Sequence, residues 1–251
     1  MPVDLLFSWM MVFLRSMGVL LGLPTLAGHP LPPLVRAAFG AMLATLLYNL
    51  VPHVDPTGYG WGEIVLAAAG EMFIGLLLGF VGRFAFAAVE VAGRIITGEI
   101  GITAAPGMGI PEPSHEPVAA FLSIFSGVLF FGTGAHHGVL AAFSRSFYFA
   151  AAGHPAWNSH AIDNLVTGTG HLIELGVRIA APFIALNFLV TLAFSVLGRA
   201  VPRMNVFVIS YSVRGLVGLA LLSGAGVLIA RYLAVEFQDL PTRMLEMLPS
   251  R

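Results

Sequence analysis

The sequence predicts an all-α, multi-span integral membrane protein with about six hydrophobic helical segments, some of them broken. Its 251 residues are 57% hydrophobic and only 10% charged, and its mean hydropathy is +0.89. Soluble domains carry about 25% charged residues. A chain this apolar has too little polar surface to cover a water-soluble globule. Helices are the open-chain structure that satisfies every backbone polar group in lipid, which predicts the all-α class.

The apolar segments follow one another with strong breaks between them. Those long and uncharged enough to be helical spans are residues 5–23, 34–51, 64–82, 118–135, 179–197 and 206–230. Prolines and glycines predict loops at residues 24–33, 52–62 and 106–117, because proline removes an amide donor and breaks helices. No basic residue precedes Arg15, which predicts an uncleaved first span rather than a signal peptide. The tail carries charges of both signs and is expected to be a short amphipathic extension.

Three charged residues, Arg15, Glu71 and Arg214, lie within or at the shoulder of apolar segments. A bare charge at the centre of a bilayer costs about 2.5–3.5 kcal/mol on insertion scales. Such side chains are expected to face a partner or water. Snorkelling toward a nearby interface is the alternative, and it suits Arg214 best. Glu71, in the middle of its segment, is the hardest to explain in that way.

Glycine pairs spaced by four residues occur at Gly18 and Gly22, at Gly75 and Gly79, and at Gly134 and Gly138. Each pair lies on one face of a helix, where the missing side chains let another backbone come close. The pairs therefore predict tight packing between helices. General enrichment of glycine in membrane helices is the alternative explanation.

The distribution of arginine predicts the topology. The first, third and fifth connectors carry Arg36, Arg83 with Arg94, and Arg199 with Arg203, and the prediction sets these against Arg145, Arg243 and Arg251 in the other connectors and the tail. The positive-inside rule then places the odd-numbered connectors in the cytoplasm and both termini outside.

Few residues form a pattern that carries chemistry. Cysteine is absent, which excludes disulfides and thiolate sites, and a net charge of -1 gives no electrostatic case for nucleic acid. The adjacent residues His136 and His137 point about 100° apart on a helix and suit packing or a helix end better than a metal site. The di-iron motif is Glu-x-x-His and occurs twice in a chain, whereas His171 and Glu174 have the reverse order and form a single such pair, so they do not predict a metal site. No nucleophile elbow, Walker loop or dinucleotide loop is present, so no catalytic residue, metal or cofactor is predicted.

Residues 98–111 form a small, apolar stretch that is poor in helix formers. A non-helical apolar segment at membrane depth is tolerated where it is buried in protein or lines a cavity. The stretch therefore suits a re-entrant loop or a plug across a pore. An ordinary surface loop whose apolar residues pack on a neighbour is the alternative.

The connector before the last segment reads Arg199-Ala200-Val201-Pro202-Arg203-Met204-Asn205-Val206-Phe207. It resembles the Arg-x-x-Pro-Gln-Met-Asn-Val-Phe signature of the flagellar and type III secretion export-gate family called FliR, or SctT in injectisomes. Arg203 departs from the family's usual glutamine and adds a charge. Ala135-His136-His137, followed by Ser146-Phe147, is similar to a weaker family element, as is Gly93-Arg94 followed by glycines 98 and 101. The family's Asp-Pro in the middle loop is missing, and Glu112-Pro113 or Glu116-Pro117 can stand in for it. The resemblance covers nearly the whole chain.

This resemblance implies a non-enzymatic subunit of the type III protein export gate in the bacterial inner membrane, at the flagellar basal body or injectisome base. Family members pack with FliP-like and FliQ-like proteins into a helical hetero-oligomer that encloses a pore for unfolded export substrates. A FlhB-like protein attaches at the cytoplasmic side. The implied partners are these proteins, the unfolded export substrates and membrane lipid. The resemblance implies no nucleic acid and no cofactor.

The resemblance also divides the chain into functional parts. Residues 1–165 would form a FliP-like helical part, with a middle plug loop near residues 105–117. Residues 166–251 would form a FliQ-like helical hairpin and tail. The residues expected to plug or gate the pore are Ala105, Pro106, Gly107, Met108, Gly109, Ile110 and Pro111. Those expected to contact partners at the cytoplasmic connector are Arg199, Pro202, Arg203, Asn205 and Phe207.

Two other functional classes compete with the export gate. A small secondary transporter or permease should have a substrate site at the bilayer midplane, often between repeated halves, but the two halves show no internal repeat. An intramembrane hydrolase would have to use His136, His137 or His171, and no motif supports it.

Overall fold

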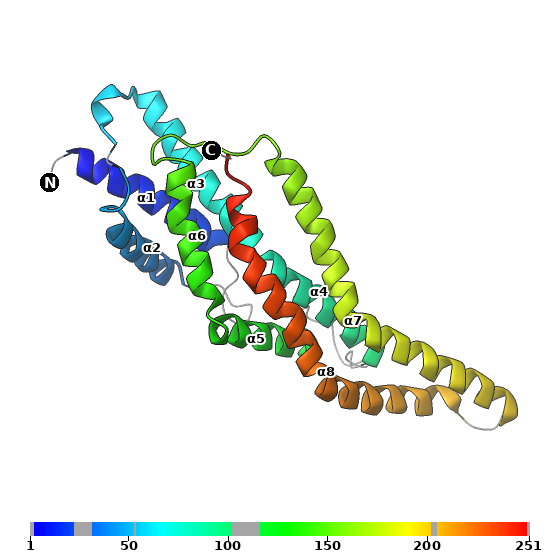
Figure 1. The fold of residues 1–251 in the computed structure, drawn as a ribbon. Helices are drawn as coiled ribbons and strands as arrows, with labels where there is room; N and C mark the ends of the chain where they lie inside the picture. The colour runs from blue at the N-terminus through cyan, green and yellow to red at the C-terminus, as the bar shows by residue number, and fades with distance from the viewer. Residues whose placement is uncertain (1–2, 23–31, 53, 102–115, 202–204, 250–251) are drawn as a thin grey trace. The chain divides into compact units, whose positions relative to one another are not determined.

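The computed structural model describes residues 3–22, 32–52, 54–101, 116–201 and 205–249, and Figure 1 shows the helices along the chain. Besides a short 3-10 turn, η2 (Pro56–Gly58), the helices are α1 (Val3–Gly22), α2 (Pro33–Leu47), α3 (Trp61–Gly82), α4 (Phe84–Ile100), α5 (Pro117–Gly132), α6 (Ala135–Phe149), α7 (Ala161–Ala200) and α8 (Val206–Leu245). These described residues contain no strand, which confirms the all-α class.

Several helices are long and apolar enough to cross a membrane. They are Asp4–Gly22, the stretch Trp61–Ile100 formed by α3 and α4, Ala161–Ala200 and Val206–Leu245. Helix α2 is apolar but has 15 residues, which at 1.5 Å per residue reach about 22 Å, less than the hydrocarbon thickness of about 30 Å. The segment predicted at residues 34–51 is therefore a shorter helix than a span requires. The description as a multi-span membrane protein is confirmed.

Helices α5 and α6 form a broken segment. They meet at an angle of 70° and pass the length and composition test for a span only together. The break lies at Thr133 and Gly134, and Gly134 has a φ of +74°. This left-handed conformation is accessible to glycine at no steric cost, so the glycine permits the change of direction. The span predicted at residues 118–135 is thus continued by a second helix after a bend.

The helices extend well beyond the apolar segments that predict them. Helix α4 occupies about half of the expected third connector, and it places Arg94 within a helix rather than in a loop. Helices α7 and α8 have 40 residues each, because no proline–glycine cluster separates their apolar parts from the polar residues that continue the helix. Most of residues 236–251, the expected amphipathic extension, is the last part of α8 and is continuous with the last span.

The chain divides into two compact units. Unit 1 comprises Met1–Ala85, Phe130–Gly170 and Glu236–Arg251, and unit 2 comprises Phe86–Leu129 and His171–Val235. Within unit 1, α1 packs along α3 through the predicted glycine pairs. A Cβ atom built on Gly75 would lie 2.2 Å from the Arg15 carbonyl oxygen, and one on Gly22 would lie 2.6 Å from the Gly79 carbonyl carbon. The two backbones are in direct contact there, as the motif predicts.

One end of unit 1 gathers segments that are far apart in sequence. The Val54 amide donates to the Ser8 hydroxyl at 2.8 Å, and the Tyr59 hydroxyl donates to the Gly153 carbonyl at 3.3 Å. The Asn158 amide side chain donates to the Glu246 carbonyl at 3.2 Å. The second connector, the fourth connector and the tail therefore meet. This is the arrangement required if they lie on one side of the membrane, as the arginine distribution predicts.

Unit 2 consists of α5 up to Leu129 and of those parts of α4, α7 and α8 that lie within it. Close contacts again occur at glycines. A Cβ atom on Gly93 would lie 2.5 Å from Ala119 Cα, one on Gly176 would lie 3.0 Å from the Ala88 carbonyl oxygen, and one on Gly218 would lie 2.5 Å from Ile100 Cγ1. Helix α4 therefore packs closely on α5, α7 and α8.

Candidate functional site

Two of the three embedded charges form a buried ion pair. Arg15 on α1 donates from Nε to Glu71 Oε2 on α3 at 2.6 Å, and both side chains are 0% exposed. Helical geometry places the two residues where α1 and α3 are in contact through their glycines. The predicted need for a partner is met within the chain, because each charge neutralises the other away from lipid.

Three further groups join this pair, while the buried Arg15 Nη2 has no hydrogen-bond partner among the described residues. Glu71 Oε1 accepts from the Gly153 amide at 2.9 Å, and Arg15 Nη1 donates to the Ser146 hydroxyl at 3.1 Å. The Phe147 ring lies 4.1 Å from the Arg15 guanidinium carbon, in cation–π geometry. Gly153 has a φ of +77°, which glycine adopts without strain. The network therefore connects α1, α3, α6 and the turn that follows α6.

Ser146 and Phe147 gain a physical role from this geometry. The sequence associates them with a family element but not with Arg15, which is more than a hundred positions away along the chain. Only the folded chain shows that they contact the guanidinium. No local signal in the sequence identifies Gly153 as a donor to Glu71.

Arg214, the third embedded charge, belongs to a different network, in unit 2. Its Nη2 donates to the Thr191 hydroxyl on α7 at 3.1 Å, and the Thr191 hydroxyl donates to the Asn187 carbonyl at 2.7 Å. The Asn187 amide donates in turn to the Glu99 carboxylate on α4. Arg214 is half-buried and bound to protein, which favours the partner explanation over snorkelling. An amide within an otherwise apolar segment was the signal that could have identified Asn187.

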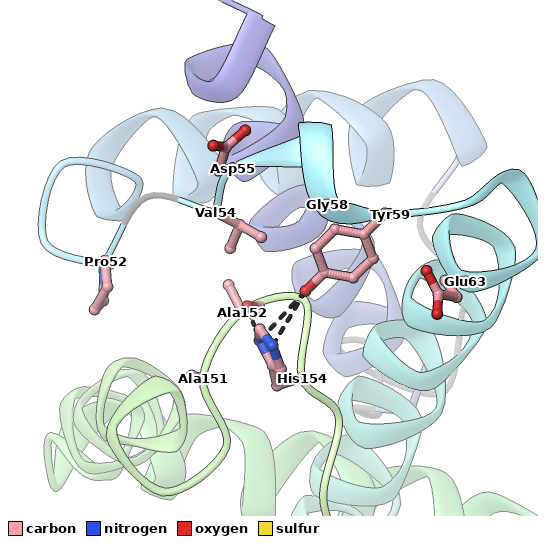
Figure 2. Close-up of a pocket in the computed structure, with 9 residues that line it drawn as sticks. All are labelled: Pro52, Val54, Asp55, Gly58, Tyr59, Glu63, Ala151, Ala152 and His154. Atoms are coloured by element: carbon pink, nitrogen blue, oxygen red, sulfur yellow. Dashed lines mark hydrogen bonds between the residues drawn. The ribbon is translucent and has the colours of Figure 1, made fainter.

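A pocket of about 460 Å³ opens at the gathered end of unit 1 (Figure 2). It is lined by Pro52, Val54, Asp55, Gly58, Tyr59, Glu63, Ala151, Ala152 and His154. The Tyr59 hydroxyl lies 3.2 Å from His154 Nε2. The hydroxyl and amide of Thr57 donate to Asp55 and lower the pKa of its carboxyl. Burial, together with the charges of Glu63 and Glu71, raises the pKa of the Tyr59 phenol.

The polar groups of this pocket already have structural partners. Asp55 Oδ1 caps η2 by accepting from the Thr57 amide at 2.9 Å, and Glu63 Oε2 accepts from the Gly60 amide at 2.8 Å. Both carboxylates of the pocket are therefore engaged in holding the backbone of this connector. In the described part of the chain, no group of three or more His, Asp or Glu residues is placed to hold a metal ion.

The histidines that carry the hydrolase alternative lie apart from such chemistry. His136 and His137 begin α6 with ring centroids 4.0 Å apart, and His136 contacts the Phe131 ring. This confirms their expected packing role at a helix end. His171 Nδ1 lies 4.0 Å from Glu174 Oε2, and Glu174 accepts from Arg178 at 2.6 Å.

The connector of residues 199–207 is described only in part. Arg199 is exposed in the last turn of α7, where its charge complements the helix dipole. Asn205 precedes α8, and its Oδ1 accepts from the Val208 amide at 3.5 Å, the position of an N-cap. Phe207 is 78% exposed. Pro202 and Arg203 lie outside the described residues, as do the predicted plug residues 105–111.

Comparisons with known proteins cover almost the entire chain. The family model described as bacterial export proteins, family 1, matches residues 6–240. Flagellar biosynthetic protein FliR of Escherichia coli K12 is 28% identical over 239 residues, covering 93% of this chain and 91% of that protein. FliR of Caulobacter vibrioides is 28% identical over 218 residues, with 85% and 86% covered.

A relative with a different name is similar over much the same part of the chain. Yop proteins translocation protein T of Yersinia pestis is 26% identical over 227 residues, covering 86% of this chain and 85% of that protein. The apolar helices, the connector motif and the family model thus agree along the chain. This chain belongs to family 1 of the bacterial export proteins, the FliR/SctT family.

Proposed function

We propose that the protein is a non-enzymatic subunit of the type III protein export gate and forms part of the substrate-conducting pore across the bacterial inner membrane. The observation that carries this proposal is the family match over residues 6–240. It is supported by relatives whose names refer to flagellar biosynthesis and to Yop translocation. Nothing in the described part of the chain favours the transporter or the hydrolase.

The surface of unit 2 supports an assembly role. In both α7 and α8, 17% of the most apolar 18-residue stretch is buried, against 44% in α1 and in the α3–α4 stretch. Large apolar side chains that are more than half exposed include Phe188, Leu192, Val196, Phe207 and Leu216. So many exposed apolar side chains on two helices indicate that lipid or another protein covers them.

Helix length favours protein as part of that cover. A helix of 40 residues is about 60 Å long, roughly twice the hydrocarbon thickness of a bilayer. Lipid tails therefore cannot cover the whole of α7 or α8 unless these helices are strongly tilted. Neighbouring helical subunits, which we propose to be FliP-like and FliQ-like proteins, would bury the remainder.

The proposed parts of the subunit follow the sequence resemblance. Residues 1–165 are the FliP-like part and residues 166–251 the FliQ-like hairpin and tail. Residues 105–111 plug the closed pore, and the connector with Arg199, Asn205 and Phe207 meets a FlhB-like protein. Unfolded export substrates pass through the pore that the assembled subunits enclose.

Co-purification tests the assignment directly. We expect an affinity-tagged chain, produced in cells with the remaining export genes, to bring down FliP-like and FliQ-like proteins in several copies each. A tagged membrane protein of unrelated family is the control for carry-over. A stable, monodisperse single chain in mild detergent, without these proteins, would contradict the gate assignment.

Deletion of residues 107–110 tests the plug. We expect the assembled gate to conduct ions or small molecules that the unaltered gate retains, because apolar residues no longer fill the opening. The measurement is conductance of the purified assembly in a planar bilayer, with the intact assembly as control. Unchanged conductance in an assembly of normal composition would rule out this segment as the plug.

A further inference from the structure

We propose that Asn187 and Tyr211 are positioning residues that fasten the C-terminal end of α4 to the α7–α8 hairpin. The contacts form a cluster that we call the α4 latch, defined by Glu99, Gly101, Asn187, Thr191, Tyr211 and Arg214. All of these residues belong to unit 2. The consequence of the latch for the pore rests on the proposed function, whereas its existence does not.

The first contact of the latch joins α4 to α7. The Asn187 amide donates to Glu99 Oε2 in the last turn of α4, and both side chains are half-buried. A carboxylate among apolar helices needs donors to replace water. Asn187 is the one amide side chain between residues 179 and 197, so it is the residue of that segment suited to hold Glu99.

A second contact brings α8 to the same turn of α7. Arg214 Nη2 donates to the Thr191 hydroxyl at 3.1 Å, and that hydroxyl donates to the backbone carbonyl of Asn187 at 2.7 Å. Positions 187 and 191 are one turn apart on one face of the helix. A carboxylate from α4 and a guanidinium from α8 therefore bind adjacent positions of α7, and the cluster combines charges of opposite sign.

The third contact holds the end of α4 itself. Gly101 ends the helix with a φ of +78°, and the Tyr211 hydroxyl donates to its carbonyl oxygen. A Cβ atom on Gly101 would lie 2.9 Å from the Tyr211 ring. Tyr211, Arg214 and Gly218 recur at spacings of three and four, so one face of α8 supplies the hydroxyl, the guanidinium and the close contact with Ile100.

The α4 latch lies directly before the proposed plug along the chain. Residues 105–111, the proposed plug, follow Gly101 within four positions along the chain. A cluster that fixes Gly101 also fixes the point from which the chain departs toward the plug. Loosening the latch should therefore weaken the seal of the closed pore without removing any plug residue.

The rate at which an introduced disulfide forms measures the contact between α4 and α8 without a measurement of pore conductance. The chain has no cysteine, so the double variant Ile100→Cys/Gly218→Cys introduces its only thiols, at positions in close contact. With diamide added as the oxidant that accepts the two electrons and two protons of the thiols, we expect Tyr211→Phe in the assembled gate to lower the initial rate of disulfide formation about fivefold, the equilibrium effect of one lost hydrogen bond. Asn187→Leu, which keeps the side-chain size but removes the donor to Glu99, should lower it at least as much.

Matched variants on the same helices serve as controls. Tyr232→Phe changes a tyrosine of α8 whose hydroxyl has no hydrogen-bond partner among the described residues, and we expect no effect on the rate. Thr191→Val removes the acceptor of Arg214 and should lower the rate. Thr169→Val removes a comparable bond on α7, from the Thr169 hydroxyl to the Leu165 carbonyl at 2.8 Å, and should not. If the Asn187→Leu variant fails to assemble, the disulfide rates of the Tyr211→Phe and Thr191→Val variants still test the latch.

Unchanged disulfide rates in both Tyr211→Phe and Thr191→Val would overturn the latch. Bilayer conductance of the same assemblies separates the latch from the plug. Lowered rates with no leak after deletion of residues 107–110 would support the latch and reject the plug. A leak after that deletion, with unchanged disulfide rates, would support the plug and reject the latch. Lowered rates together with a leak in Tyr211→Phe support both.

Discussion

Replacement of Glu71 by alanine is expected to lower the free energy of unfolding by about 3–5 kcal/mol, the usual cost of leaving one member of a buried ion pair alone. The Arg15 guanidinium would stay 0% exposed while losing the carboxylate at 2.6 Å. The Gly153 amide would lose its acceptor as well. Thermal unfolding of the purified assembly, together with the amount of the chain in membranes, measures the effect.

The chain provides a control for this prediction in the pair Glu174–Arg178. Its nitrogen–oxygen distance is also 2.6 Å, but the side chains are 54% and 61% exposed. Glu174→Ala should cost less than about 1 kcal/mol, because solvent screens an exposed pair. Equal effects of Glu71→Ala and Glu174→Ala would contradict the central role of the buried pair.

A double variant separates the loss of the pair from the loss of packing. Arg15→Met/Glu71→Leu replaces both charges by apolar groups of similar size, which is often neutral for a buried pair. We expect it to be more stable than Glu71→Ala. A double variant less stable than the single one would show that the hydrogen bonds to Ser146 and Gly153 matter more than the charge balance.

The second large effect is expected at Gly75, where α1 and α3 are in backbone contact. An alanine Cβ would lie 2.2 Å from the Arg15 carbonyl oxygen and 2.9 Å from Gly18 Cα. Backbone cannot move aside as a flexible side chain can, so the helices must separate. We expect Gly75→Ala to destabilise by about 3 kcal/mol, at the upper end of the usual range for overpacking, as measured by thermal unfolding of the assembly.

Gly62→Ala in the first turn of the same helix is the control. No atom lies within 4 Å of a Cβ built on Gly62, and alanine is favoured over glycine in helices by about 1 kcal/mol. The two substitutions are chemically identical, but their effects on the free energy of unfolding should have opposite signs. If Gly75→Ala were as harmless as Gly62→Ala, the glycine pairs would reflect composition rather than contact.

The extent of the helices could be predicted only in part. Apolar runs identified the cores of α1, α3, α5, α7 and α8, because lipid and protein interiors select the same side chains. Helix α4 was not among the predicted spans, because Glu90 and Arg94 interrupt its apolar sequence. The bend at Gly134 was missed because glycines in an apolar segment, here Gly132 and Gly134, do not specify a change of helix direction.

The candidate site residues could also be predicted only in part. Hydropathy alone singled out Arg15, Glu71 and Arg214, because charges in apolar segments carry an energetic cost. Which of them pair could not be predicted, since helical periodicity describes one helix and not the register between two. The glycine spacing predicted close contact between helices, but not that α1 meets α3.

The amino-acid sequence by itself determined the membrane character, the helical class and the family, because composition, apolar length and a connector motif are local properties of the chain. Only the tertiary structure decided that Arg15 binds Glu71 and that Arg214 of α8 binds α7 one turn away from Asn187, the partner of Glu99. Partners so distant in sequence are chosen by packing, which brings together the faces whose glycines, charges and hydrogen-bonding groups fit.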